Sequence, residues 1–154
     1  MDLYLVRHGE AKLEEEDPAR PLSERGRGEV ERVGRALARL GLGVSEIRHS
    51  GKLRARETAE ILGRHLRPGR GLGQTPGLAP NDDPAAARAT AEEATESLML
   101  VGHLPHLSGL ASLLLTGDPS REVVAFRMAS VVALRLGPEG WRLGWALTPE
   151  MVSE

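Results

Sequence analysis

Leu3-Tyr4-Leu5-Val6-Arg7-His8-Gly9, close to the amino terminus, is the stretch that decides the fold class. Four consecutive apolar residues with bulky or β-branched side chains predict a buried strand. Gly9 then permits a sharp turn and the close approach of a ligand. In open α/β sheets, ligands bind at the carboxyl ends of the strands, which is where Arg7 and His8 would lie. A neutral imidazole is a nucleophile and a guanidinium binds phosphate with two prongs, so this segment predicts a phosphoryl-transfer site.

A second segment repeats this arrangement far along the chain. Residues 98–101 are apolar, and Gly102-His103 follows them directly. A single Arg-His pair after a strand is more often surface than site. Two strands that both end in a histidine instead indicate one paired site at a common sheet edge.

Composition narrows the possible classes of protein. The chain has 154 residues, a net charge of −2 and no cysteine. This length fits one domain over 1–154, and the charge gives no reason to expect a nucleic-acid partner. No apolar run is long enough for a membrane span and no signal peptide is evident, so we expect no membrane partner and a cytoplasmic location. The absence of cysteine excludes disulfides, thiolate zinc sites and cysteine-based phosphatase chemistry.

Apolar spacing and helix-breaking residues predict alternating strands and helices. Ser23 is the expected N-cap of a helix that ends at Gly41. Its expected apolar face contains Val30, Val33, Leu37 and Leu40. Loops are expected over 12–22 and over the Gly- and Pro-rich residues 67–83. Further strands are expected over 44–49, 131–136 and 141–147, and further helices over 52–66, 85–94 and 105–115. This order predicts a single three-layer α/β/α domain with a mostly parallel central sheet, helices on both faces and a final hairpin as an antiparallel edge.

A third segment adds positive charge to the predicted site. Residues 50–58 run from a strand end into a helix, and Arg54 falls in the first turn of that helix. Free N–H groups at a helix N-terminus also attract phosphate. Arg54 is therefore expected to join Arg7 around a phosphoryl group. Arg56 lies about 200° further round the helix and is expected to point elsewhere.

These three segments resemble the motifs of the histidine phosphatase (phosphoglycerate mutase-like) superfamily. The motifs stand here as Arg7-His8-Gly9-Glu10, Ser50-Gly51-Lys52-Leu53-Arg54-Ala55-Arg56-Glu57-Thr58 and Gly102-His103. Within the superfamily, the chain looks most like the small bacterial phosphohistidine phosphatases. The supporting segments are Arg7-His8-Gly9-Glu10-Ala11, Arg20-Pro21-Leu22-Ser23-Glu24-Arg25-Gly26 and His103-Leu104-Pro105. The likeness extends from residue 1 to about residue 147.

The resemblance implies a mechanism and a set of roles. His8 would attack phosphorus and form a phosphohistidine intermediate that water then hydrolyses. Its other ring nitrogen would be held by an acceptor, for which a backbone carbonyl is expected. Arg7, Arg54 and His103 would hold the phosphoryl oxygens without a metal or another cofactor. Arg20 and Leu104 are further candidates for contacts with the substrate at the rim of the site.

The resemblance leaves the general acid and the substrate open. The segment that carries an acidic residue and a covering insertion in larger relatives is short here. Its Asp82 and Asp83 are candidates for the acid, but a role only as helix caps is expected more strongly for them. The expected partner is a histidine-phosphorylated protein, such as a phosphotransfer domain. The alternatives are a phosphomonoesterase for a small phosphorylated metabolite and a phosphate-binding module without catalysis.

The remaining histidines carry less information. His49 is expected to be structural or on the surface, and His65 to be on a helix surface. His106 could line the entrance of the pocket or lie on a helix surface. His103 and His106 have the spacing of a metal pair, but no further ligand motif accompanies them, so no metal site is expected.

Overall fold

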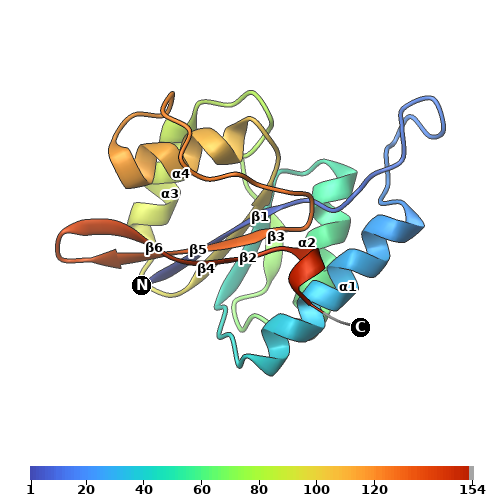
Figure 1. The fold of residues 1–154 in the computed structure, drawn as a ribbon, viewed down its shortest axis with the longest axis horizontal. Coiled ribbons are helices and arrows are strands. Elements are labelled where there is room, and N and C mark those ends of the chain that lie inside the picture. The colour runs from blue at the N-terminus through green and yellow to red at the C-terminus, as the bar shows by residue number, and fades with distance from the viewer. Residues whose placement is uncertain (153–154) are drawn as a thin grey trace.

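A six-stranded sheet runs through the centre of the molecule (Figure 1) in the computed structural model, which describes residues 1–152. The strand order is β3-β2-β4-β1-β5-β6. The strands are β1 (Asp2–Arg7), β2 (Glu46–His49), β3 (Leu72–Gln74), β4 (Leu98–Gly102), β5 (Val131–Gly137) and β6 (Gly140–Leu147). The pairs β1–β4, β4–β2 and β2–β3 are parallel. The pairs β1–β5 and β5–β6 are antiparallel. The mostly parallel sheet with an antiparallel edge hairpin is confirmed.

Helices cover both faces of this sheet. They are α1 (Glu24–Arg39), α2 (Leu53–Leu66), α3 (Pro84–Glu93) and α4 (His106–Thr116), followed by a 3-10 turn, η1 (Pro149–Met151). Figure 1 shows α1 and α2 together on one side and α3 and α4 together on the other. Each helix pair covers its own buried apolar cluster. The predicted three-layer arrangement is therefore confirmed.

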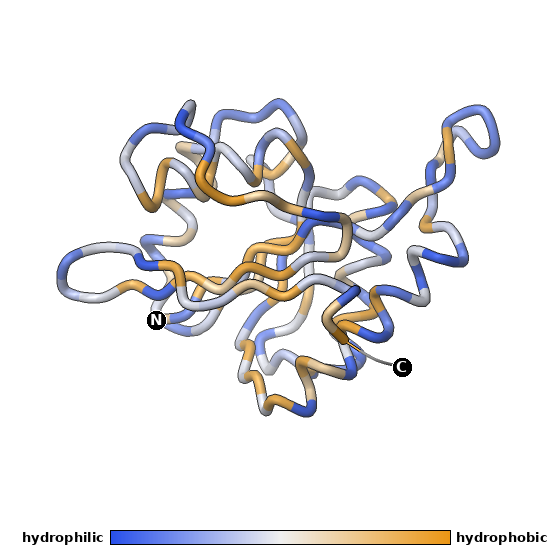
Figure 2. The backbone as a smooth tube through the Cα atoms, in the orientation of Figure 1, coloured by the Kyte–Doolittle hydropathy of each residue, from blue (hydrophilic) through white to orange (hydrophobic). Residues whose placement is uncertain are grey.

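The central strands are apolar because both of their faces are covered. Every residue of β4 is buried, and so are the four residues between the ends of β1. Two-sided burial is typical of parallel strands and explains a continuous apolar run where a half-exposed strand would alternate. Figure 2 shows the same concentration of apolar residues in the middle of the sheet.

Local signals set several helix ends. The Ser23 hydroxyl accepts a hydrogen bond from the Gly26 N–H at the start of α1, as its N-cap position predicts. Gly41, just past the end of α1, has a φ of +70°, a left-handed conformation that glycine adopts without strain. Asp83 caps α3 by accepting from the Ala85 N–H.

Other expectations were wrong in part. Residues 67–83 contain the short strand β3, which adds to the edge of β2 although its sequence is rich in glycine. Its pairing comes from a neighbouring strand and not from local propensity. Leu40 is not on the buried face of α1: the helix ends at Arg39, and Leu40 is 67% exposed. The strand expected from residue 44 begins at Glu46.

No helix among residues 1–152 is both long enough and apolar enough to cross a membrane.

Candidate active site

The register of two central strands brings the two predicted histidines together. Parallel β1 and β4 align Arg7 with Gly102, so His8 and His103 leave the sheet side by side. The His8 N–H donates to the Gly102 carbonyl at 3.0 Å, and the two imidazole ring centres lie 5.0 Å apart. The paired site that the sequence predicts is therefore formed at the carboxyl ends of neighbouring strands.

The four site residues predicted from the motifs line one cleft of about 950 Å³. They are Arg7, His8, Arg54 and His103. Arg54 comes from the first turn of α2, which follows β2, the neighbour of β4 in the sheet. Arg20 and Leu104, which were expected at the rim of the site, also line this cleft.

His8 is held in the form that a nucleophile requires. Its Nδ1 lies 2.7 Å from the Gly9 carbonyl oxygen. Because a carbonyl can only accept, Nδ1 carries the proton and the lone pair of a neutral ring is on Nε2. Burial, more than the nearby charges of Arg54 and Arg7, lowers the pKa of His8 to about 4. His8 is therefore neutral at pH 7, as its proposed chemistry needs.

Arg7 and Arg54 supply positive charge to the lining of the cleft. Arg7 Nη1 donates to the Phe126 carbonyl at 3.0 Å, which fixes one side of its guanidinium. Burial lowers the pKa of Arg7 and also that of Arg54, to which the charge of Arg20 contributes. An arginine remains protonated despite such shifts. The Nε atoms of Arg7 and Arg54 are buried and have no hydrogen-bond partner within residues 1–152.

Arg20 is directed by a strained backbone. Its φ is +50°, which is uncommon for a residue other than glycine. Its Nε donates to the Lys12 carbonyl at 3.0 Å, so the side chain folds back across its own loop. That loop is closed by a bridge between Ala11 and Leu22. Arg20 thus reaches the cleft occupied by His8 and Arg54 from a separate segment.

His103 has a hydrogen bond that the sequence analysis did not assign. Its Nε2 lies 2.6 Å from the Ser50 hydroxyl oxygen. Burial, followed by the positive charges around it, lowers the pKa of His103 to about 3, so this ring is also neutral at pH 7. The signal in the sequence was a serine at the end of a strand, a residue type that is common in turns for other reasons.

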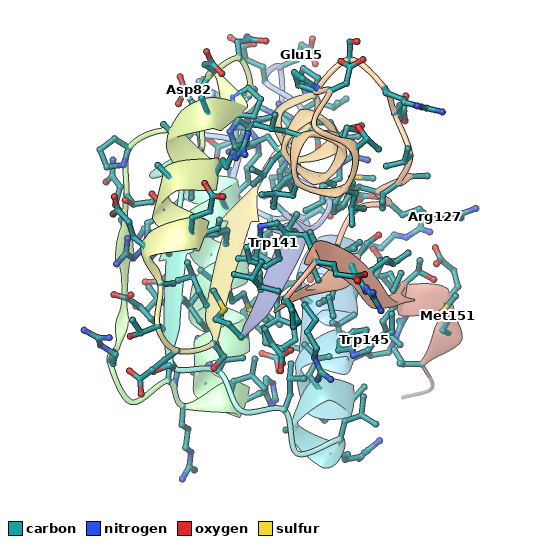
Figure 3. The ribbon with its side chains drawn as sticks, turned by 90° about the vertical axis from the view of Figure 1, so that its left-hand side faces the viewer. Glu15, Asp82, Arg127, Trp141, Trp145 and Met151 are labelled. Carbon is teal, nitrogen blue, oxygen red and sulfur yellow. The ribbon has the colours of Figure 1, made fainter. Side chains whose placement is uncertain are left out.

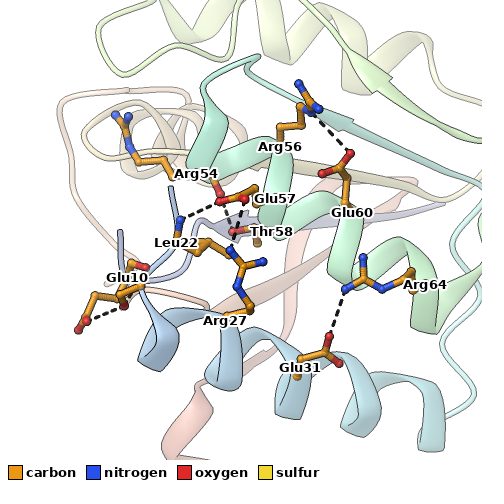
Figure 4. A network of polar contacts seen from close by, with 11 residues as sticks. Glu10, Leu22, Arg27, Glu31, Arg54, Arg56, Glu57, Thr58, Glu60 and Arg64 are labelled. Atoms are coloured by element: carbon orange, nitrogen blue, oxygen red, sulfur yellow. Dashed lines mark hydrogen bonds and ion pairs between the residues drawn. The ribbon is translucent and has the colours of Figure 1, made fainter. Parts of the chain in front are cut away.

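Two further residues connect α2 to the nucleophile loop. The buried Thr58 hydroxyl accepts from the Gly9 N–H at 3.1 Å and donates to the Arg54 carbonyl at 2.8 Å. Glu57 accepts from the Leu22 N–H at 2.7 Å (Figure 4). These bonds fix the Arg54 turn against the segment after His8. Thr58 is part of the recognised motif, but its partners could not be read from the sequence.

Arg56 points away from the site, as its angular position predicts. Its Nε lies 3.5 Å from a Glu60 carboxylate oxygen on the exposed side of α2 (Figure 4).

Asp82 and Asp83 form local hydrogen bonds outside the cleft lining. Asp82 accepts from the Ala79 N–H at 2.9 Å, and Asp83 caps α3. Figure 3 shows Asp82 at the same end of the molecule as Glu15. Pro80 is the residue of this segment that contributes to the cleft.

The other histidines lie deeper than expected for surface residues. His106 is 2% exposed, so the helix-surface interpretation was wrong, and it is not among the residues that line the cleft. The His65 side chain is partly buried and its Nε2 lies 2.7 Å from a Glu31 carboxylate oxygen, which ties α2 to α1. The structural interpretation of His49 holds: it is buried, and its Nδ1 accepts from the Gly51 N–H. Within residues 1–152, no three histidine, aspartate or glutamate side chains are grouped closely enough to hold a metal ion.

Comparison with known proteins agrees with this fold. The sequence profile of the histidine phosphatase superfamily (branch 1) matches residues 3–79. An uncharacterized protein of Picosynechococcus sp. is 37% identical over 148 residues, which cover 89% of this chain and 86% of that protein. The chain therefore belongs to the histidine phosphatase superfamily, branch 1. It is a phosphatase of that superfamily.

Solved structures with the same fold include phosphatases with different substrates. The protein histidine phosphatase SixA, solved with tungstate, superposes with a TM-score of 0.84 at 24% identity, over 98% of this chain and 99% of that one. A mycobacterial glucosyl-3-phosphoglycerate phosphatase, solved with VO3, gives 0.69 at 19% identity, over 94% and 98%. The TM-scores of these two matches establish the shared fold.

Proposed function

We propose that this phosphatase removes the phosphoryl group from phosphohistidine on a protein. The observation that carries the proposal is the course of the segment between α2 and β4. It forms β3 at the sheet edge and α3 packed on α4, and contributes Pro80 to the cleft. The cleft is therefore not covered by this segment, and a phosphorylated side chain on a folded protein can reach it.

The proposed reaction proceeds in two displacements at phosphorus. In the first, the lone pair on His8 Nε2 attacks, the P–N bond of the substrate breaks, and the released imidazole takes up a proton. In the second, water attacks phosphorus, the bond to Nε2 breaks, and phosphate leaves with His8 regenerated. Arg7, Arg54 and His103 hold the oxygens whose charge grows in each transition state, and Arg20 assists from the rim.

The imidazole leaving group of phosphohistidine explains why turnover does not require a strong general acid. An imidazole nitrogen accepts a proton readily, whereas an alcohol leaving as an alkoxide needs a positioned general acid. Asp82 and Asp83 both accept backbone hydrogen bonds, and neither is among the residues that line the cleft. This supports phosphohistidine over an alkyl phosphate ester.

The rim of the cleft offers contacts suited to a protein surface. Leu13 is 59% exposed and Met128 is 37% exposed, and both line the cleft with Leu104. These apolar side chains come from three separate segments around the phosphate-binding residues. A small anionic metabolite would gain little from contact with these apolar side chains, whereas a docked protein would bury them.

The test compares kcat/KM for a phosphohistidine-bearing phosphotransfer domain with kcat/KM for a panel of small phosphate esters, without added metal. We expect the protein to be preferred by at least about a hundredfold, and His8→Ala to reduce its turnover to background. Preference for one ester over the protein would overturn the proposal. Unchanged turnover in His8→Ala would overturn the mechanism for either substrate.

A small phosphate ester is the second candidate, because a phosphatase of glucosyl-3-phosphoglycerate shares the fold. This activity needs a proton donor, for which Asp82 and Asp83 are the candidates. Under this alternative, Asp82→Asn or Asp83→Asn lowers kcat for the ester by about two orders of magnitude. If both variants keep full ester hydrolysis, neither residue is the acid.

A further inference from the structure

Ser50 occupies a position that links two strand ends at the site. It is the first residue after β2, and the parallel register pairs His49 of β2 with Val101 of β4. The chain therefore leaves β2 beside the point at which Gly102-His103 leaves β4. At that point the Ser50 hydroxyl oxygen is 2.6 Å from His103 Nε2.

The protons around Ser50 can be assigned from its partners. Its hydroxyl oxygen accepts a hydrogen bond from the Lys52 N–H at 3.3 Å. The single hydroxyl proton then needs an acceptor, and His103 Nε2 is the partner within hydrogen-bond distance. If Nε2 carried the proton instead, the hydroxyl oxygen would receive two N–H groups. The hydroxyl proton of Ser50 would then have no acceptor among the contacts within residues 1–152.

The consequence falls on the other nitrogen of the His103 ring. His103 is buried and neutral, so its ring carries one proton, and a lone pair on Nε2 puts that proton on Nδ1. Nδ1 is buried and has no partner within residues 1–152, although His103 lines the phosphate cleft. If a phosphoryl oxygen is bound at Nδ1, the opposite tautomer would direct a lone pair toward this anionic group, which is repulsive.

We propose that Ser50 is a positioning residue that holds His103 as its Nδ1–H tautomer, so that Nδ1 donates to an oxygen of the transferring phosphoryl group. This inference rests on the proposed function of His103 in holding that group. Ser50 does not touch the reacting atoms; it acts through the ring of His103. The same hydroxyl also restrains rotation of the ring about its Cβ bond.

The test measures the tautomer of His103 directly and then measures the effect of Ser50 on turnover. Long-range ¹H–¹⁵N spectra of the free wild-type protein at pH 7 are expected to show His103 with Nδ1 protonated and Nε2 unprotonated. Ser50→Ala is expected to shift His103 toward the other tautomer and to lower kcat by about tenfold to a hundredfold. Ser50→Thr keeps a hydroxyl at the same atom and is expected to restore both the tautomer and most of kcat.

Ser97→Ala is the matched control. The Ser97 hydroxyl also accepts a backbone N–H, from Ser45, but this pair lies at the opposite end of β2 and β4. Its kcat is expected to equal that of the wild type. A wild-type His103 protonated on Nε2 would overturn the inference, and so would a folded Ser50→Ala with kcat within twofold of wild type.

The two proposals fail in different ways. If the wild type hydrolyses a small ester and not the phosphohistidine protein, the proposed substrate is wrong, while the tautomer and the effect of Ser50→Ala can be measured with that ester. If the protein substrate is preferred but the tautomer is unaffected by Ser50→Ala, the role of Ser50 is wrong and the proposed function stands.

Discussion

His8 is buried and yet keeps a free lone pair at neutral pH, because its protonated form is destabilised. Its side chain lies just past the end of a buried strand and lines the same cleft as Arg7 and Arg54, so a positive charge on the ring would be both desolvated and repelled. The Gly9 carbonyl accepts the Nδ1 proton and leaves the lone pair on Nε2, the atom proposed to attack phosphorus. A surface histidine would be partly protonated near neutral pH and would lose that lone pair.

The first prediction concerns the titration of this residue. In NMR titrations of the free protein, His8 is expected to protonate at about pH 4 and not near 6.5. Arg54→Gln removes a nearby positive charge and is expected to raise the pKa of His8 only slightly, because burial is the larger cause. Titration of His8 near pH 6.5 would show that the ring is more hydrated than the structure indicates.

At the scale of elements, the loop between β1 and α1 is held tightly against the start of α1. Gly26, in the first turn of α1, packs directly on the backbone of Glu10, and an added Cβ would overlap the Glu10 carbonyl oxygen. The Ser23 hydroxyl further binds this loop by donating to a Glu10 carboxylate oxygen at 2.8 Å. The segment that follows His8 therefore depends on a glycine in the neighbouring helix.

Two glycine substitutions in the same helix should have opposite effects. Gly26→Ala is expected to lower the free energy of unfolding by about 2 kcal/mol or more, because backbone atoms must move to admit the methyl group. Gly28→Ala meets no atom within 4 Å and is expected to raise it by up to about 1 kcal/mol, since alanine favours the helix. Urea unfolding of both variants measures this difference. Equal stability of the two would contradict the close packing of Gly26 on Glu10.

At the scale of the whole molecule, the two-sided burial of the sheet encloses several neutral histidines. Burial is the main cause of a lowered pKa for His8, His49, His103 and His106. Each of these residues binds a proton more readily in the unfolded chain. Between pH 6.5 and about 4, the unfolded state therefore binds more protons, and the free energy of unfolding must fall as the pH falls.

This predicts a marked loss of stability in mild acid. Between pH 7.5 and pH 5, the protonation of His8 and that of His103 are each expected to lower the free energy of unfolding by about 2 kcal/mol. The reason is that their pKa values are about 4 and about 3 in the folded protein and 6.5 in the unfolded chain. Urea unfolding at the two pH values measures the change. His8→Asn is expected to lose less of its free energy of unfolding between pH 7.5 and pH 5 than the wild type does. A free energy of unfolding that does not vary over this range would contradict the prediction.

The sequence by itself predicted which residues carry the chemistry and determined how most of the chain folds. Apolar runs, a glycine after each of two strands, and the N-cap Ser23 are local signals, and the structure bears each of them out. The motifs around His8, Arg54 and His103 also sufficed to predict that these side chains meet, because parallel strands bring their carboxyl ends to one edge.

Tertiary structure alone decided the finer features. The pairing of β3 with β2, the exposure of Leu40 and the burial of His106 depend on neighbours far along the chain. The same is true of the bond between Ser50 and His103 and of the Thr58 bond to Gly9, since each joins residues about fifty positions apart. Local sequence limits which conformations and chemistries are available, whereas hydrogen-bond partners and burial are set by long-range packing, which a single residue's identity does not encode.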